Sequence, residues 1–111
     1  MFCKSGNSGY KRLAAGVKIK TLVYGEKTHA TEFRLKKGSI VSSHSHPHEQ
    51  TGYLISGRMR LVIGGDTCEV EPGDSWCILE NVEHFGEVLE DSVAVEVFSP
   101  VREDYLPGAN G

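Results

Sequence analysis

The chain is built mostly of short runs rich in β-branched and aromatic residues, and glycine or proline interrupts them at short intervals. Residues 17–24 alternate apolar and polar side chains for several positions, as a half-buried strand does. No amphipathic helical pattern of useful length is present. The pattern therefore predicts an all-β fold, a small barrel or sandwich of eight or more short strands.

Turn signals divide the expected strands. Ser56-Gly57 separates two β-prone runs and predicts a hairpin, and Glu71-Pro72-Gly73-Asp74 is typical of a tight turn. The acidic residues 87–91 are expected to form a solvated loop. The expected strands are residues 17–24, 28–35, 51–56, 58–63, 67–70, 75–79 and 92–98.

The length of 111 residues corresponds to a single domain. We expect residues 1–16 to form an irregular N-terminal arm, with Tyr10 and Leu13 as docking residues, and residues 17–107 to form one barrel domain. The net charge of −3, from 12 basic and 15 acidic residues, gives no reason to expect nucleic acid or an anionic membrane as a partner.

The cysteines and the N-terminal residues indicate the cellular compartment. Cys3, Cys68 and Cys77 are odd in number and lack a C-x-x-C spacing, which favours reduced thiols over a disulfide framework. The first residues lack the apolar core of a signal peptide, and no apolar run reaches transmembrane length. These features predict a soluble cytoplasmic protein.

Three histidines, His44, His46 and His48, fall within five residues, and Gln50 follows two positions later. Neutral imidazole is a common metal ligand, and on an extended chain His44 and His46 project from the same face. The pair therefore has the spacing to chelate one ion. The alternative from these residues alone is a polar surface loop whose histidines merely titrate.

A wider pattern resembles the two motifs of the cupin family. Gly38, His44-x-His46, Gln50 and Gly57 match the first motif, and Pro72-x-Asp74 with His84 matches the second. The family usually has Glu where this chain has Gln50, and often Pro where it has Leu79. The resemblance implies a double-stranded β-helix (jelly-roll barrel). It also implies one divalent metal ion as cofactor, with the ligands His44, His46, Gln50 and His84.

The match extends over nearly the whole chain to the KdgF group of cupins, through residues 16–18, 44–50 and 97–106. The resemblance implies conversion of unsaturated uronate monosaccharides to linear keto-uronates. It assigns catalysis to Glu96 and Arg102, and substrate binding to Phe98 and Arg102. The group often has Asp at the first of these positions, so Glu96 is longer by one methylene.

The residue chemistry agrees with such a reaction. Four neutral ligands leave the whole charge of a divalent ion in place, which favours an anionic sugar-acid substrate. Arg102 has the planar fork for a carboxylate, and Glu96 supplies the proton transfer needed when the ring opens and an enol becomes a ketone. Nitrogen and amide-oxygen ligands suit nickel, manganese, iron, cobalt or zinc.

Two other functions remain open: an iron-dependent cupin dioxygenase, and a non-catalytic module that binds a sugar acid. A homodimer that pairs through residues 17–35 is expected, because an uncovered sheet edge favours association.

The remaining residues have simpler expectations. His48 is expected at the rim of the site and His29 in solvent, whereas Trp76, Tyr53 and Cys77 are expected to fill the core without a site role.

Overall fold

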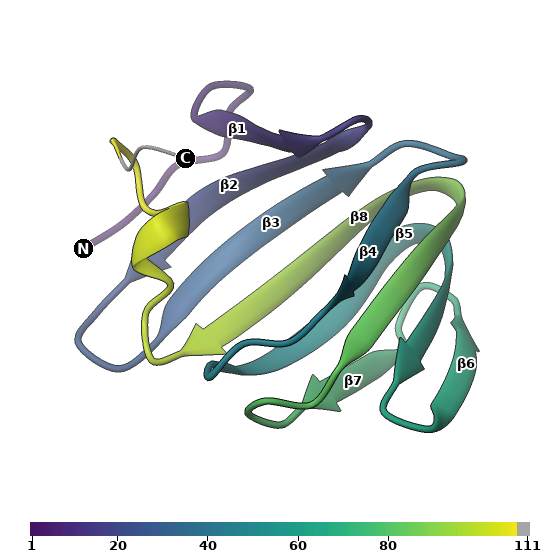
Figure 1. Cartoon of the computed structure of the whole chain (residues 1–111). Helices are drawn as coiled ribbons and strands as arrows, with labels where there is room; N and C mark the ends of the chain where they lie inside the picture. The colour runs from purple at the N-terminus through teal and green to yellow at the C-terminus, as the bar shows by residue number, and fades with distance from the viewer. Residues whose placement is uncertain (109–111) are drawn as a thin grey trace.

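Every strand in the computed structural model pairs antiparallel with its neighbours. The structure describes residues 1–108, and Figure 1 shows their path. The all-β prediction is confirmed. The elements are β1 (Tyr10–Ala14), β2 (Val17–Tyr24), β3 (His29–Leu35), β4 (Ile40–His44), β5 (Glu49–Ile63), β6 (Asp66–Val70), β7 (Ser75–Ile78), β8 (His84–Ser99) and the 3-10 turn η1 (Glu103–Tyr105).

Two long strands, β5 and β8, belong to both layers of the barrel (Figure 1). The second half of β8 pairs with β3 and with the first half of β5, which also pairs with β7. The first half of β8 pairs with β4 and with the second half of β5, which also pairs with β6. The inner faces of the two layers therefore enclose one interior.

The corner of β5 lies at Gly57. Its φ is +92°, and an added Cβ would lie 2.2 Å from Ser92 Oγ and 2.3 Å from the carbonyl oxygen of Asp91. The register between β5 and β8 shifts around this position, and Ser92 Oγ accepts a hydrogen bond from the Arg58 amide at 3.1 Å. Gly57 therefore bends one continuous strand between the layers, and the predicted hairpin at Ser56-Gly57 is wrong.

Two other expectations differ from the structure. Residues 10–14, expected to be irregular, form β1 and pair with β2, because Leu13 packs on the core and Tyr10 donates a hydrogen bond to Glu32. Residues 87–91, expected to form a loop, continue β8, since Val88 is buried and Glu87 pairs with Arg60 at 3.2 Å. Backbone pairing with β5, and with β4 at Glu87, outweighs the local acidity of this segment.

The interior is filled by side chains that alternate inward along the strands. The core cluster includes Ile19, Phe33, Leu54, Val88 and Phe98. Gln50, His84 and Glu96 face the same interior, so the folding of the core also sets the polar groups. Within the described residues, no helix is long and apolar enough to cross a membrane.

The replacement Gly57→Ala is expected to lower the free energy of unfolding by about 2–4 kcal/mol, because it combines a positive φ with a clash against backbone atoms. The matched control is Gly25→Ala, where an added Cβ meets nothing within 4 Å and φ is not positive. Urea unfolding measures both variants. Equal stability of the two would contradict the proposed role of Gly57 at the corner.

Candidate functional site

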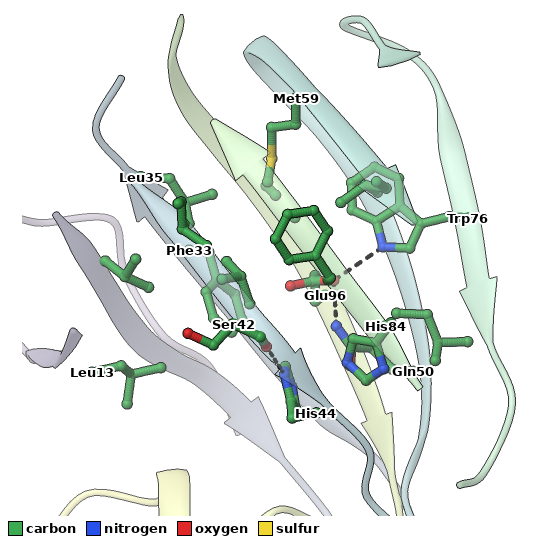
Figure 2. Close-up of a pocket in the computed structure, with 18 of the residues that line it drawn as sticks. Leu13, Phe33, Leu35, Ser42, His44, Gln50, Met59, Trp76, His84 and Glu96 are labelled. Carbon is green, nitrogen blue, oxygen red and sulfur yellow. Dashed lines mark hydrogen bonds between the residues drawn. The ribbon is translucent and has the colours of Figure 1, made fainter. Parts of the chain in front are cut away.

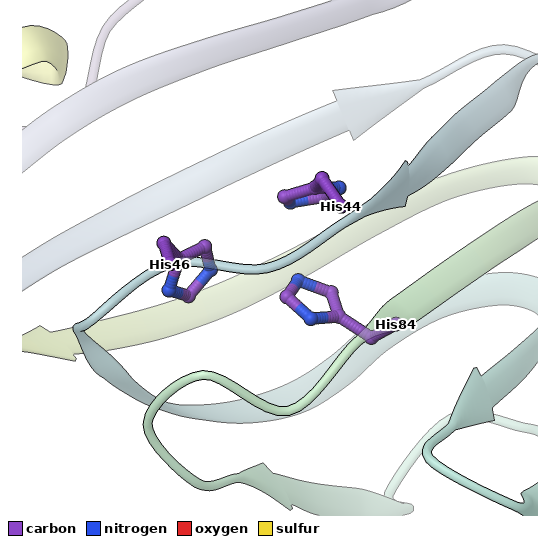
Figure 3. Close-up of side chains that lie close together, drawn as sticks. All are labelled: His44, His46 and His84. Atoms are coloured by element: carbon purple, nitrogen blue, oxygen red, sulfur yellow. The ribbon is translucent and has the colours of Figure 1, made fainter.

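Residues far apart in the sequence meet at one end of the barrel interior. His44 ends β4 and lies opposite His84 at the start of β8, and Gln50 of β5 lies opposite Phe98 of β8. His46 lies in the segment that follows β4. Figure 3 shows the rings of His44, His46 and His84 converging.

The three rings form a compact nitrogen cluster. One ring nitrogen from each of His44, His46 and His84 lies within 4.8 Å of the others. The Nδ1 atoms face backbone carbonyls, those of Ser42 at 2.6 Å, His48 at 2.9 Å and Val82 at 2.9 Å. A carbonyl can only accept, so each Nδ1 carries the proton and each Nε2 keeps its lone pair, as a metal ligand requires.

Two features of the cluster fit a cation. His84 Nε2 is buried and has no hydrogen-bond partner among the described residues. His46 Nε2 lies 3.1 Å from Gln50 Oε1, and with the proton on Nδ1 both atoms are acceptors. Facing lone pairs repel unless they share a positive ion. The residues present therefore fit a bound metal ion.

Burial and a nearby cation favour the neutral form of two of these imidazoles, those of His46 and His84. Burial lowers the pKa of His46 to about 4, with further contributions from the positive charge of Arg102 and from His84. Burial also lowers the pKa of His84, although its hydrogen bond to the Val82 carbonyl acts in the opposite direction. Neutral imidazole is the form that binds metal.

Glu96 lies next to this cluster at a buried position on β8. Its Oε1 accepts hydrogen bonds from Gln50 Nε2 at 2.5 Å and from Trp76 Nε1 at 3.1 Å. Burial raises the pKa of Glu96, and these two hydrogen bonds oppose the rise. The Gln50 amide therefore points its nitrogen at Glu96 and its oxygen at the histidines (Figure 2).

Arg102 lies on the other side of Phe98, directly after the strand. Its Nε and one terminal nitrogen donate to the two carboxylate oxygens of Asp104, at 3.1 and 2.8 Å. The guanidinium carbon lies 3.9 Å from the centre of the Tyr105 ring and 5.3 Å from that of Phe98. Asp104 thus occupies one edge of the fork, and the Tyr105 side chain is a second close neighbour of the guanidinium.

The sequence reasoning missed Trp76, Asp104 and Tyr105. Trp76 was expected only in the core, yet it touches Glu96. The available signal was Gly52 inside an expected strand, because a glycine there often marks the close approach of another group, and the structure pairs Gly52 of β5 with Trp76 of β7. Asp104 and Tyr105 lie two and three positions after Arg102, but only the η1 turn folds them back onto it.

His29 was expected in solvent, and that expectation is wrong because the ring is completely buried. Its Nδ1 accepts the Arg102 backbone N–H at 3.3 Å, and its Nε2 donates to Thr21 Oγ1 at 2.9 Å. The Thr21 hydroxyl donates in turn to the Tyr105 carbonyl at 3.2 Å. The ring therefore anchors the C-terminal segment that carries Arg102.

Other expectations have mixed outcomes. His48 lies beside the cluster, with its ring 5.6 Å from that of His46, as expected for a rim residue. Tyr53 and Cys77 are exposed rather than buried, since they lie on the outward faces of β5 and β7.

A cavity of about 310 Å³ joins these groups. This volume lies near the lower end of small-molecule pockets, which span about 300–1,000 Å³. Its polar lining includes His44, Gln50, His84, Glu96 and Arg102, whereas His46 is not among the lining residues. Most of the remaining lining is apolar, so the polar groups are concentrated on a limited part of the wall.

We expect His29 to make stability depend on pH. Burial holds the pKa of His29 below its ordinary value of 6.5, so the unfolded chain binds a proton first on acidification. This contribution to stability is complete above pH 6.5 and is lost as the pH falls from there toward the lower folded-state pKa.

His29→Gln retains a donor and an acceptor but does not titrate. Between pH 7.5 and 5.5 the free energy of unfolding is expected to fall further for the original chain than for the variant. The other histidines are common to both proteins and cancel in the difference. Parallel losses would contradict this account of His29.

Comparison with known proteins agrees with this geometry. The cupin domain model matches residues 31–99. The pectin degradation protein KdgF of Dickeya dadantii (strain 3937) is 30% identical over 99 residues, covering 87% of this chain and 90% of that protein.

Two solved structures are similar over most of their length. KdgF from Halomonas sp. has a TM-score of 0.83 at 26% identity, covering 87% of this chain and 90% of that one. An RmlC-like cupin from Shewanella frigidimarina NCIMB 400 has a TM-score of 0.87 at 24% identity, covering 94% and 95%, and supports the fold alone. The chain belongs to the cupin family and is a relative of KdgF.

Proposed function

We propose that His44, His46, Gln50 and His84 hold one divalent transition-metal ion. Three Nε2 lone pairs, of which that of His84 has no hydrogen-bond partner among the described residues, and the oxygen of Gln50 support this ligand set. Imidazole and amide ligands suit nickel, manganese, iron, cobalt or zinc. When bound, the ion would act as a Lewis acid that stabilises negative charge on a substrate oxygen.

We further propose that the protein converts a 4,5-unsaturated uronate monosaccharide to the linear keto-uronate. The observation that carries this proposal is that the Glu96 carboxyl and the histidine cluster line the same cavity. The relationship to a pectin degradation protein favours a sugar acid as substrate. The expected homodimer and the cytoplasmic location stay predictions.

The reaction is an isomerisation and needs only proton transfers. The bond between C1 and the ring oxygen breaks, the C1 hydroxyl loses its proton and becomes an aldehyde, and the ring oxygen becomes the enol oxygen at C5. C4 then gains a proton while the enol loses its own, which yields the ketone. Atoms and electrons balance without an oxidant or reductant.

The protein groups have distinct roles in this proposal. Glu96 moves protons between the substrate oxygens and C4, because it is the carboxyl that lines the cavity beside the cluster. Arg102 binds the substrate carboxylate through guanidinium N–H groups that do not donate to Asp104. Phe98, which packs between His46 and Arg102, supplies an apolar wall for the ring.

Metal binding predicts a stabilisation that depends on His84. At a free metal concentration about 100 times Kd, the ion adds about 2.7 kcal/mol and raises the melting temperature by roughly ten degrees. His84→Gln is expected to lose most of this shift, whereas the matched control His48→Gln keeps it. Melting curves with and without nickel, manganese or zinc, together with metal content after dialysis, measure the effect. Equal shifts in both variants would exclude His84 as a ligand.

Catalysis predicts faster loss of substrate absorbance. A lyase-generated unsaturated monouronate absorbs through its C4–C5 double bond, and this absorbance is expected to decay faster with protein than without it. Glu96→Gln keeps an acceptor for Gln50 and Trp76, and kcat is expected to fall about a hundredfold or more with little change in KM. An oxygen electrode separates this reaction from a dioxygenase. Equal decay with and without protein would refute the proposed reaction.

A further inference from the structure

The two oxygens of Glu96 have different surroundings. Oε1 accepts both the Gln50 amide and the Trp76 indole N–H. Among the described residues, no hydrogen bond reaches Oε2. Oε2 is also not completely buried. Glu96 lines the cavity, and Figure 2 shows its second oxygen directed away from the two donors. Oε2 is therefore the oxygen open to a ligand.

The approach of Trp76 to Glu96 depends on Gly52. In the sheet, Gly52 of β5 lies opposite Trp76 of β7 on one side and Glu96 of β8 on the other. A Cβ on Gly52 would lie 2.1 Å from Trp76 Cε2 and 2.2 Å from Nε1. The indole therefore lies over the backbone of β5 at Gly52, and its N–H reaches the Glu96 carboxylate on the next strand, β8.

We infer that Trp76, seated over Gly52, is a positioning residue that holds Oε1 of Glu96 and so assigns proton exchange with the substrate to Oε2. The catalytic consequence of this inference rests on the proposed function. The hydrogen bond between Trp76 and Glu96 does not depend on it. Catalytic geometry is sensitive to displacements of about 1 Å, which can cost about a hundredfold in rate.

The two donors restrain the carboxyl group in different directions. Gln50 approaches Oε1 from β5 on the side of the histidines, and Trp76 approaches it from β7. If Gln50 were the only donor, the Glu96 carboxylate would have one hydrogen bond, and it could rotate about the Cγ–Cδ bond. With both donors on one oxygen, rotation breaks two bonds, and Oε2 keeps a constant direction into the cavity.

The contact has a direct spectroscopic readout, because Trp76 is the single tryptophan of the chain. Its indole N–H gives one cross-peak in a proton–nitrogen NMR spectrum of the full-length protein. A carboxylate acceptor should place this peak downfield and slow its exchange with solvent. Glu96→Gln is expected to move it upfield, and Glu96→Ala further still.

Gly52→Ala is expected to shift the same peak, because the added Cβ displaces the indole while the chain keeps its tryptophan. Its matched control is Gly65→Ala, where an added Cβ meets nothing within 4 Å. An indole peak that is unchanged in both Glu96 variants would overturn the inference, whatever the activity of the protein.

Kinetics then test the positioning role. Trp76→Phe keeps a ring over Gly52 but loses the donor, and kcat is expected to fall roughly tenfold to a hundredfold while KM and metal content stay near those of the original chain. Gly52→Ala should give a similar fall, and the double variant should be no slower than the worse single variant. An unchanged kcat in Trp76→Phe would overturn the inference.

The two proposals fail in distinguishable ways. If the original chain does not convert the unsaturated monouronate, the proposed function fails, and the NMR shifts alone decide whether Trp76 holds Glu96. If the original chain is active and Trp76→Phe is equally active, the proposed function stands and the positioning role is refuted.

Discussion

The site depends on the side-chain amide of Gln50, because its nitrogen and its oxygen contact different groups. Its nitrogen donates to Glu96 and its oxygen faces His46, so one side chain links the acid to the histidine cluster. A carboxylate at position 50 would face Glu96 as a second negative group at the same short distance, and like charges there cannot both ionise without a large cost. The amide therefore allows a buried acid beside the proposed metal site.

The rest of the barrel serves to keep these groups in place. Backbone carbonyls of Ser42, His48 and Val82 orient the three imidazoles, so the direction of each ring follows from the path of the chain. The bend at Gly57 lets β5 carry Gln50 in one layer and continue into the other. The C-terminal segment is attached through His29, which binds the backbone of Arg102.

Much of this arrangement was predictable from the sequence. Alternating strands indicate an all-β fold, and the spacing of His44, His46, Gln50 and His84 singles out residues that do meet in space. The predictions failed where local signals compete with tertiary pairing. Gly57 has the signature of a hairpin turn but bends a continuous strand. Residues 87–91 contain three acidic side chains yet remain in β8, because β5 pairs along this segment and β4 pairs with Glu87.

The sequence by itself determined the chemical inventory: which imidazoles, amide, carboxyl and guanidinium are available, and that short alternating runs must form a sheet. Only the tertiary structure decided which atoms of those groups face one another. Trp76 and Glu96 are 20 residues apart and meet over Gly52, and Asp104 takes one edge of Arg102. The physical reason is that side-chain direction depends on strand register and on the partners across the sheet, and these are non-local.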